Sequence, residues 1–484
     1  MMGVKAIPGK LLLFVAVSAF VSACAGGQPV VQGPPVATFV LLGDTRPVGT
    51  GVQPYAFQEL VDMVAREKPL AVFHTGDIID GYGLDKQDSI ASYKEFKRVA
   101  SGFGVPVYAV PGDHDVFDVI SEDLFKTQVG PLYRSVEISG CAFILLNTET
   151  PGAPMRLDSE QYKWLETELK KFHQTTRQIF IVMHRPLWPV DGQKGNSLDA
   201  YRNHRDYLVG LFKKYGVRFV FTGHEHLYAK VEKDGITQFI TGGGGAPLDA
   251  EESEGGYNHF IVVTVTGPFP ETPDSPARPV EVKIHPVRVS DPVSVALENI
   301  HNGEPVLSFD IIKRARGMNR LQNHPDVKIV LGITHMAIGE MATGRDMIGE
   351  VISRRPGSAL TAGNMLMYMG WPREAATVFM AGIKKKPRDP LLYEGMAEAW
   401  FKLGNRPNAV KALISAAKIN RRYANPYYRL MNFYLKDEKP DKAKKAAANF
   451  VKIRPFGRRA SKALKLLNRK LPRPPPPGTA GNGR

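Results

Sequence analysis

Polar residues that could carry chemistry follow short apolar runs in this chain. The run 105–111 ends at Gly112, and Asp113, His114 and Asp115 come directly after it. An apolar run of this length predicts a buried strand, and ligand crevices in open α/β sheets lie at the carboxyl ends of strands. Carboxylate and imidazole groups at such an edge could bind a metal ion and supply a proton donor.

The same arrangement recurs along the chain. An apolar run, or the glycine turn after it, precedes each of Asp44, Asp77, Asp113, His114, His184, His224 and His226. Taken singly, an Asp after a strand is most often a helix N-cap, and a lone His is most often structural. His224 and His226 stand two residues apart, so both point the same way from an extended strand. As a set, the carboxylates and imidazoles suit divalent Mn, Fe, Zn or Co.

Strands and helices alternate in the part of the chain that must position these residues. Apolar runs at 36–42, 70–73 and 105–110 predict strands, and helical spacing at 54–67 and 89–99 predicts helices between them. This order indicates a β-α-β-α-β layout with a largely parallel sheet. A strand-rich part continues to residue 289 and begins with a predicted hairpin, 133–147, in which Cys141 is expected to be a buried apolar strand residue.

A helical internal repeat occupies residues 356–457. Ala375, Ala409 and Ala443 are spaced 34 residues apart. Four more columns share this register, among them Gly370/Gly404/Glu438 and Gly363/Ala397/Met431. Small residues where two helices touch, at this period, are typical of tetratricopeptide (TPR) repeats. A generic helical bundle is the alternative, and five columns over three units favour the repeat.

Five motifs occur in a fixed order between residues 36 and 289: Gly43-Asp44-Thr45-Arg46, Gly76-Asp77-Ile78-Ile79-Asp80, Gly112-Asp113-His114-Asp115, His184-Arg185-Pro186 and Gly223-His224-Glu225-His226. This order resembles the calcineurin-like metallophosphoesterases. The resemblance implies an αββα sandwich, in which two mixed sheets are flanked by helices, followed here by an all-α TPR-like domain. It also implies hydrolysis of a phosphomonoester or phosphodiester, with two divalent metals lowering the pKa of a bridging water.

The resemblance implies roles for particular residues. The metal ligands would be Asp77, bridging both ions, Asp44 and His226 at the first ion, and Asp113, His184 and His224 at the second. His114 would be the general acid, or the group that stabilises charge near the leaving group. Asp80 and Asp115 are expected to support these residues or to cap the turns.

Two positions depart from the family pattern. Arg46 stands where the family has a histidine ligand, and Asp113 stands where it has asparagine. One hypothesis is that Arg46 contacts the substrate phosphate bidentately while Asp113 holds the second metal more tightly. The rival is that Arg46 pairs with Asp113 and the site holds one metal or none. A catalytically weak or inactive scaffold is therefore the alternative function, and a third interpretation makes the repeats the main function.

The formal net charge of the 484-residue chain is +15, and much of the excess lies in the repeat region and its end. A solvated outer helix face is the simplest explanation. Stacked repeats commonly bind proteins, so a protein partner is expected there. Nucleic acid is not an expected partner, because the N-terminus, described next, is typical of an exported protein.

The N-terminus is typical of an exported protein. Lys5 and Lys10 precede the apolar run 11–21, and Val21-Ser22-Ala23-Cys24 resembles the bacterial lipobox. Cys24 is therefore the expected lipidation site, which predicts a lipid-anchored protein of the cell envelope. The expected organisation is a signal peptide at 1–23, a tether at 24–35, the phosphoesterase-like domain at 36–290, a linker with helical content at 291–355, TPR-like repeats at 356–470 and a disordered tail at 471–484.

Overall fold

The computed structural model describes residues 36–47, 53–176, 178–190, 194–267, 278–287, 291–317, 321, 324–454 and 458–468. The predicted signal peptide, Cys24, the tether and the tail lie outside these ranges. No helix in the described ranges combines the length and the apolar character needed to cross a membrane.

The first sheet has five strands in the order β13-β12-β1-β2-β3. These strands are β1 (Val36–Leu42), β2 (Ala71–His74), β3 (Val107–Ala109), β12 (Asn258–Thr266) and β13 (Val280–Val287). The strands β1, β2 and β3 are parallel, while β12 and β13 are antiparallel to their neighbours. The predicted parallel order of the first three strands is confirmed, and the sheet as a whole is mixed.

The second sheet has six strands in the order β10-β11-β9-β8-β5-β4. These are β4 (Arg134–Ile138), β5 (Cys141–Leu146), β8 (Ile179–Met183), β9 (Phe219–Thr222), β10 (Tyr228–Lys233) and β11 (Ile236–Thr241). The predicted hairpin is β4–β5, and Cys141 is a fully buried free thiol in β5. A short pair, β6 (Glu149–Thr150) and β7 (Ala153–Pro154), stands apart.

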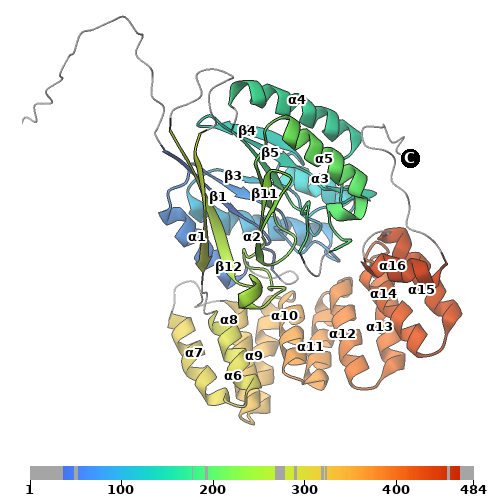
Figure 1. Cartoon of the computed structure of the whole chain (residues 1–484). Coiled ribbons are helices and arrows are strands. Elements are labelled where there is room, and N and C mark those ends of the chain that lie inside the picture. Colours follow the sequence, from blue (N-terminus) through green and yellow to red (C-terminus); the bar gives the residue numbers. More distant parts are fainter. Residues whose placement is uncertain are drawn as a thin grey trace, which may run out of the picture.

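Aromatic side chains hold the two sheets face to face. Phe39 and Phe73 of the first sheet meet Phe143 of the second, with ring centroids 4.7 and 3.8 Å from the Phe143 ring. The outer faces are covered by helices α1 (Tyr55–Arg66), α2 (Lys86–Ala100) and α3 (Val119–Gln128) on the first sheet, and α4 (Ser159–Thr175) and α5 (Arg202–Lys214) on the second. Three 3-10 turns, η1 (Ser101–Phe103), η2 (Leu198–Tyr201) and η3 (Glu252–Glu254), lie in the connections. The predicted αββα sandwich is confirmed (Figure 1).

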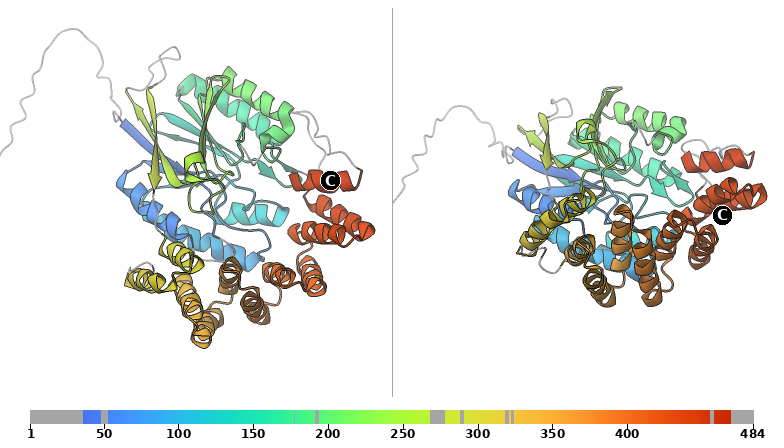
Figure 2. Two further views of the ribbon diagram at one scale, coloured as in Figure 1. Left: turned by 60° about the horizontal axis from the view of Figure 1, so that its bottom comes forward. Right: turned by 90° about the horizontal axis from the view of Figure 1, so that it is seen from below.

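An all-helical part follows the sandwich. Its helices are α6 (Pro292–His301), α7 (Pro305–Gly317), α8 (Pro325–Ala337), α9 (Met341–Arg354), α10 (Ser358–Tyr368), α11 (Pro372–Lys385), α12 (Pro390–Lys402), α13 (Arg406–Ile419), α14 (Asn425–Lys436), α15 (Pro440–Ile453) and α16 (Arg458–Leu466). In both views of Figure 2 these helices curve around one side of the sandwich.

The 34-residue pattern corresponds to helix pairs. Ala375, Ala409 and Ala443 are fully buried in α11, α13 and α15, the second helix of each pair. Gly363 in α10 lies so close to the Phe379 ring that an added Cβ would stand 2.3 Å from it. The column Gly370/Gly404/Glu438 follows the first helix of each pair, with φ of 73°, 77° and 53°. A left-handed residue there ends each helix and turns the chain.

Helices α6–α9 belong to the same packed unit as the repeats. Residues 291–355 were predicted to be a linker with helical content, but one continuous hydrophobic core runs from Val293 in α6 to Ala399 in α12. The helical solenoid therefore begins directly after the last strand.

Candidate metal centre

The six predicted ligands lie where the carboxyl ends of strands from the two sheets meet. Asp44, Asp77 and Asp113 follow β1, β2 and β3 of the first sheet. His184, His224 and His226 follow β8 and β9 of the second sheet. One sheet thus supplies the carboxylates and the other the imidazoles.

Strained backbone places three of these side chains. Asp44, Asp77 and His224 have φ of 58°, 58° and 72°, in the left-handed region that non-glycine residues rarely adopt. Each such residue costs on the order of 1–3 kcal/mol, and such strain clusters at functional sites. A Cβ at Gly112 would lie 2.1 Å from Asp77 Oδ1, so the glycine of this motif is required for the turns to approach each other.

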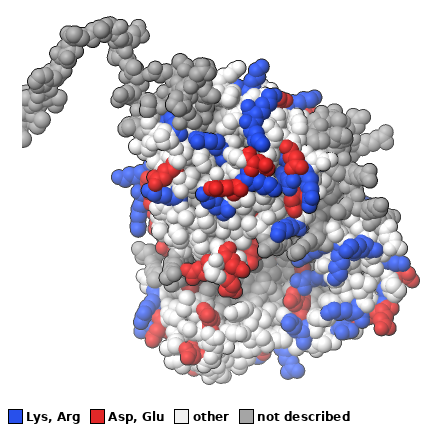
Figure 3. All heavy atoms as spheres, in the orientation of Figure 1, with Lys and Arg blue, Asp and Glu red and all other residues white. Residues whose placement is uncertain are grey.

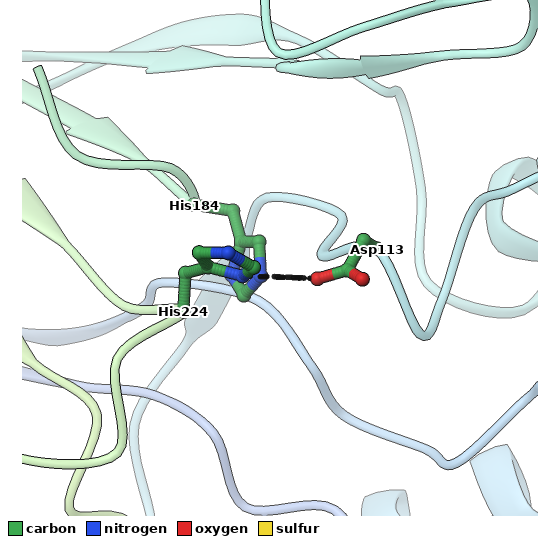
Figure 4. A group of neighbouring side chains, drawn as sticks. All are labelled: Asp113, His184 and His224. Atoms are coloured by element: carbon green, nitrogen blue, oxygen red, sulfur yellow. Dashed lines mark hydrogen bonds and ion pairs between the residues drawn. The ribbon is translucent and has the colours of Figure 1, made fainter. Parts of the chain in front are cut away.

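Asp113, His184 and His224 form the first cluster (Figure 4). Asp113 Oδ1 lies 3.3 Å from His184 Nε2 and 3.0 Å from His224 Nδ1. All three side chains are buried, and each offers one donor atom toward a common point. We refer to these residues as the Asp113 cluster.

Asp44, Asp77 and His184 form the second cluster, called here the Asp44 cluster. His184 Nε2 lies 3.5 Å from Asp77 Oδ1, so this imidazole stands between the two clusters. His226 Nε2 lies 3.5 Å from Asp44 Oδ1, beside the cluster to which the sequence assigned it. The sequence assigned His184 to the second metal only, whereas its position serves both clusters.

The donor set fits divalent metal ions. The Nδ1–H of His184 donates to the Thr75 carbonyl at 2.9 Å, and the Nδ1–H of His226 donates to the Pro247 carbonyl at 2.6 Å. Each Nε2 is thereby turned toward the carboxylates, as in known histidine metal sites. Buried carboxylates this close together also require positive charge nearby.

The charges of the site shift several pKa values. Burial, and then the Asp77 charge, raise the pKa of Asp44 well above its ordinary value, although His184 acts against this. Burial would lower the pKa of His184, but Asp77, Asp113 and Asp44 raise it to about 10. For Asp77, burial is outweighed by His184, His114 and Arg46, and its pKa falls to about 2. The negative charges of the carboxylates therefore favour a protonated, positively charged His184.

Arg46 pairs with Asp77 and not with Asp113. Its Nε lies 3.3 Å from Asp77 Oδ2. The predicted pairing of Arg46 with Asp113 is wrong, because Arg46 contacts Asp77 instead. Asp113 is instead approached by Arg185 and Arg454, at 3.4 and 3.2 Å.

His114 is held with one ring nitrogen toward the site. Its Nδ1 lies 2.7 Å from Asp80 Oδ1, and its Nε2 lies 4.0 Å from Asp77 Oδ2. The ring packs edge to face with Tyr82, with centroids 4.6 Å apart. An Asp–His pair of this kind fixes the orientation of the imidazole, which a proton donor requires.

Other residues flagged in the sequence hold the loops in place. Asp115 accepts hydrogen bonds from the backbone N–H groups of Ile78, Ile79 and Gly112, and so ties the Asp77 turn to the Asp113 turn. Burial, and then the Asp77 charge, raise its pKa to about 7. His74 Nε2 lies 3.0 Å from Thr45 Oγ1 and so joins the end of β2 to the turn after β1.

Four residues of the site escaped the sequence reasoning. Arg185 lies between Glu149, at 2.7 Å, and the Nε2 atom of His224, at 3.0 Å. Tyr82 donates to Asp113 Oδ2 at 3.1 Å, and Asn196 lies 3.1 Å from His224 Nε2. Arg185 stands inside the His184-Arg185-Pro186 motif and could have been flagged. Arg454, which is 341 residues from Asp113, has no sequence signal.

Comparison with known proteins identifies the domain. The family model for calcineurin-like phosphoesterases matches residues 37–228. The chain is 28% identical over 153 residues to a serine/threonine-protein phosphatase, CPPED1, of Danio rerio, covering 30% of this chain and 49% of that protein. It is 28% identical over 168 residues to a probable glycerophosphodiester phosphodiesterase, GpdQ, of Arcobacter nitrofigilis, covering 33% of this chain and 58% of that protein. The matches thus span about half of each relative.

The helical part resembles TPR proteins. A thermophilic TPR protein of Thermus thermophilus matches 37% of this chain and 98% of its own, at 16% identity and a TM-score of 0.25. Residues 37–228 thus match the calcineurin-like phosphoesterase family and lie in a calcineurin-like αββα sandwich. The TPR-like character of the helical region rests on its helix pairs and their 34-residue period.

Proposed function

We propose that this protein is a metal-dependent phosphoesterase that hydrolyses a phosphomonoester or phosphodiester. The observation that carries the proposal is the pair of buried carboxylate–imidazole clusters, joined by His184, where the two sheet edges meet. A phosphatase and a probable phosphodiesterase among the relatives support it.

Two divalent cations are proposed as cofactors, held by Asp44, Asp77, Asp113, His184, His224 and His226. When bound, such ions supply charge that binds phosphate oxygens and lowers the pKa of a water molecule. The ligand set is compatible with Mn, Fe, Zn or Co.

The remaining roles belong to side chains of the chain itself. His114 protonates the leaving oxygen through Nε2, while Asp80 holds Nδ1 at 2.7 Å. Arg46 brings a permanent positive charge to the site, and we propose that it binds a phosphate oxygen of the substrate.

A second candidate function is a scaffold with weak or no catalysis. The observation that favours it is that arginines already neutralise two of the carboxylates, through Arg46–Asp77 and Arg454–Asp113. Arginine pairs could replace bound metal in such a protein.

Metal-dependent turnover separates the two candidates. The purified chain is freed of metal and assayed for p-nitrophenyl phosphate and bis-p-nitrophenyl phosphate hydrolysis, with and without added Mn²⁺ or Zn²⁺. The phosphoesterase proposal expects turnover of at least one compound that depends on metal and disappears in Asp77→Ala. A folded chain that binds no metal and hydrolyses neither compound would favour the scaffold.

We also propose that Cys24 is lipidated and anchors the protein in the bacterial envelope. The lipobox-like Val21-Ser22-Ala23-Cys24 supports this proposal. Growth with labelled palmitate should label the wild type and not Cys24→Ser. Label that persists in Cys24→Ser would overturn it.

We propose in addition that the TPR-like helices bind a protein partner. Met380 on α11 and Tyr368 on α10 are hydrophobic side chains left about half exposed, which a partner would cover. A photocrosslinker at position 380 should yield one discrete product in cells, while the same probe at the exposed position 163 of α4 should not. Identical products from both positions would contradict the proposal.

A further inference from the structure

The helical region reaches into the candidate metal centre. Arg454, directly after α15, places Nη2 3.2 Å from Asp113 Oδ2 and 2.7 Å from Tyr82 Oη. Its guanidinium carbon lies 4.6 Å from the centroid of the Tyr82 ring. A stacked arginine that also donates hydrogen bonds is held in one orientation. The end of the solenoid is therefore part of the site.

Two more ion pairs fix this arrangement. Lys386, after α11, lies 2.5 Å from Asp88 of α2, and Arg422, before α14, lies 3.1 Å from Asp118, the N-cap of α3. The helices α11–α15 thus lie along the α1–α3 side of the sandwich, as Figures 1 and 2 show. The solenoid forms a wall of the site.

A cleft of about 500 Å³ lies between this wall and the catalytic loops. It opens at the metal centre, because Asp113 and Arg185 line it. Phe117 and Met155 line it from the sandwich, and Tyr427 and Ile453 line it from α14 and α15. Its walls therefore offer apolar and aromatic surface next to the Asp113 cluster, enough room for an organic group.

The cleft also carries surplus positive charge. Five cationic side chains and three carboxylates line it. Each carboxylate already has an arginine partner: Asp113 with Arg454, Asp118 with Arg422 and Glu149 with Arg185. The two other cations, Arg421 and Lys452, form no ion pair with any residue in the described part of the chain, and both are exposed. Lysine and arginine side chains also gather on the face over the C-terminal helices (Figure 3).

We infer that this cleft binds the leaving group of the substrate, and that this group is a partly apolar organic moiety with a negative charge of its own. Arg421 and Lys452 recognise that charge, and Arg454 positions the reacting phosphate beside the Asp113 cluster. The inference rests on the proposed phosphoesterase function and specifies its substrate class. The specificity of the enzyme then depends on the solenoid as well as on the sandwich.

A matched pair of probes tests the inference. The probes are 2-naphthyl phosphate and 6-sulfo-2-naphthyl phosphate, which share a flat apolar leaving group and differ by one remote negative charge. The full chain should prefer the sulfonated probe in kcat/KM by roughly five-fold, since two exposed cations contribute modestly. In the double variant Arg421→Ala/Lys452→Ala the ratio of the two kcat/KM values should fall close to one. Lys445→Ala, on α15 outside the cleft, is the matched control and should keep the wild-type ratio.

Two results would overturn the inference. One is a wild type with no preference for the sulfonated probe, and the other is a double variant that keeps the wild-type preference. If the wild type hydrolyses neither probe, calorimetric binding of the sulfonated probe tests the cleft alone, and the p-nitrophenyl phosphate and bis-p-nitrophenyl phosphate assays still decide the proposed phosphoesterase function. Binding that weakens in the double variant and not in Lys445→Ala supports the cleft, and no binding or equal binding refutes it.

Discussion

The Asp113 cluster and the Asp44 cluster differ in their ligands and in the arginines that contact them. The Asp113 cluster has two imidazoles and a carboxylate around one point, with Tyr82 and Arg454 holding the outer oxygen of Asp113. The Asp44 cluster has two carboxylates and shares its imidazole, and Arg46 already pairs with Asp77 there. The family pattern has a histidine where Arg46 stands.

This difference predicts unequal metal sites. A neutral imidazole donates a lone pair to a metal, whereas a guanidinium has none, so Arg46 leaves the Asp44 cluster one ligand short of the family pattern. We therefore expect the Asp113 cluster to bind its ion tightly and the Asp44 cluster to bind its ion weakly. The substitutions below test that ordering.

The largest effect is expected when the Asp113 cluster loses a ligand. His224→Ala should lower kcat/KM by more than about 100-fold, since even residues that support metal ligands cost 10- to 100-fold when replaced. Activity and bound metal, measured by elemental analysis, should fall together. His285→Ala on β13, far from both clusters, is the control and should retain both. Full activity in His224→Ala would contradict the assignment.

Arg46→His should strengthen the weaker half of the site. The substitution removes a positive charge 3.3 Å from Asp77 and adds a ligand, so the second ion should bind on the order of ten-fold more tightly. Metal titration of the metal-free protein followed by calorimetry measures this, and Arg46→Ala should fall between. Weaker binding in Arg46→His would show that Arg46 does not oppose the metal.

Arg454→Ala should weaken substrate binding and leave metal binding unchanged. Loss of this half-exposed cation should lower kcat/KM by roughly ten-fold, mainly through KM, at unchanged metal content. Arg454→Lys should restore part of the loss, because lysine keeps the charge but not the planar stacking on Tyr82. Arg406→Ala, paired with Asp437 on the solenoid surface, is the control. Higher activity in Arg454→Ala would indicate an inhibitory contact instead.

The smallest effect concerns His259 in β12, whose ring packs against Gly243. Burial lowers its pKa to about 4, although a hydrogen bond to the Tyr257 carbonyl acts in the other direction. The unfolded chain, with an ordinary histidine pKa, takes up a proton as the pH falls below about 6.5, whereas the folded chain does not until about pH 4. The contribution of neutral His259 to stability is therefore lost as the pH falls through this window, by at most about 3 kcal/mol.

His259→Gln should reduce that acid sensitivity. The fall in thermal midpoint between about pH 7 and about pH 5 should be smaller in the variant than in the wild type. An equal fall in both proteins would mean that His259 is not the titrating group.

The sequence predicted those features that depend on local pattern. The positions of Asp44, Asp77 and Asp113 follow from short apolar runs ending in glycine, and the Ala375/Ala409/Ala443 column follows from a fixed period. Both signals lie within a few residues or one repeat, so they can be found without knowing the packing.

Features that depend on long-range packing were not predictable. Arg454 meets Asp113 only because the solenoid curves back to the sandwich, and no local pattern encodes that curvature. The pairing of Arg46 with Asp77 also depends on how two separate turns pack, so no local pattern predicts it. The inclusion of α6–α9 in the solenoid core was missed because their sequence lies outside the 34-residue register.

Metal titration of the metal-free full chain, with turnover recorded at each addition, tests the central claim most directly. The account predicts two unequal binding steps, with p-nitrophenyl ester hydrolysis appearing as metal binds, and the tighter step missing in His224→Ala. A folded wild-type chain that takes up no metal, or one whose hydrolysis is the same with and without metal, would contradict it.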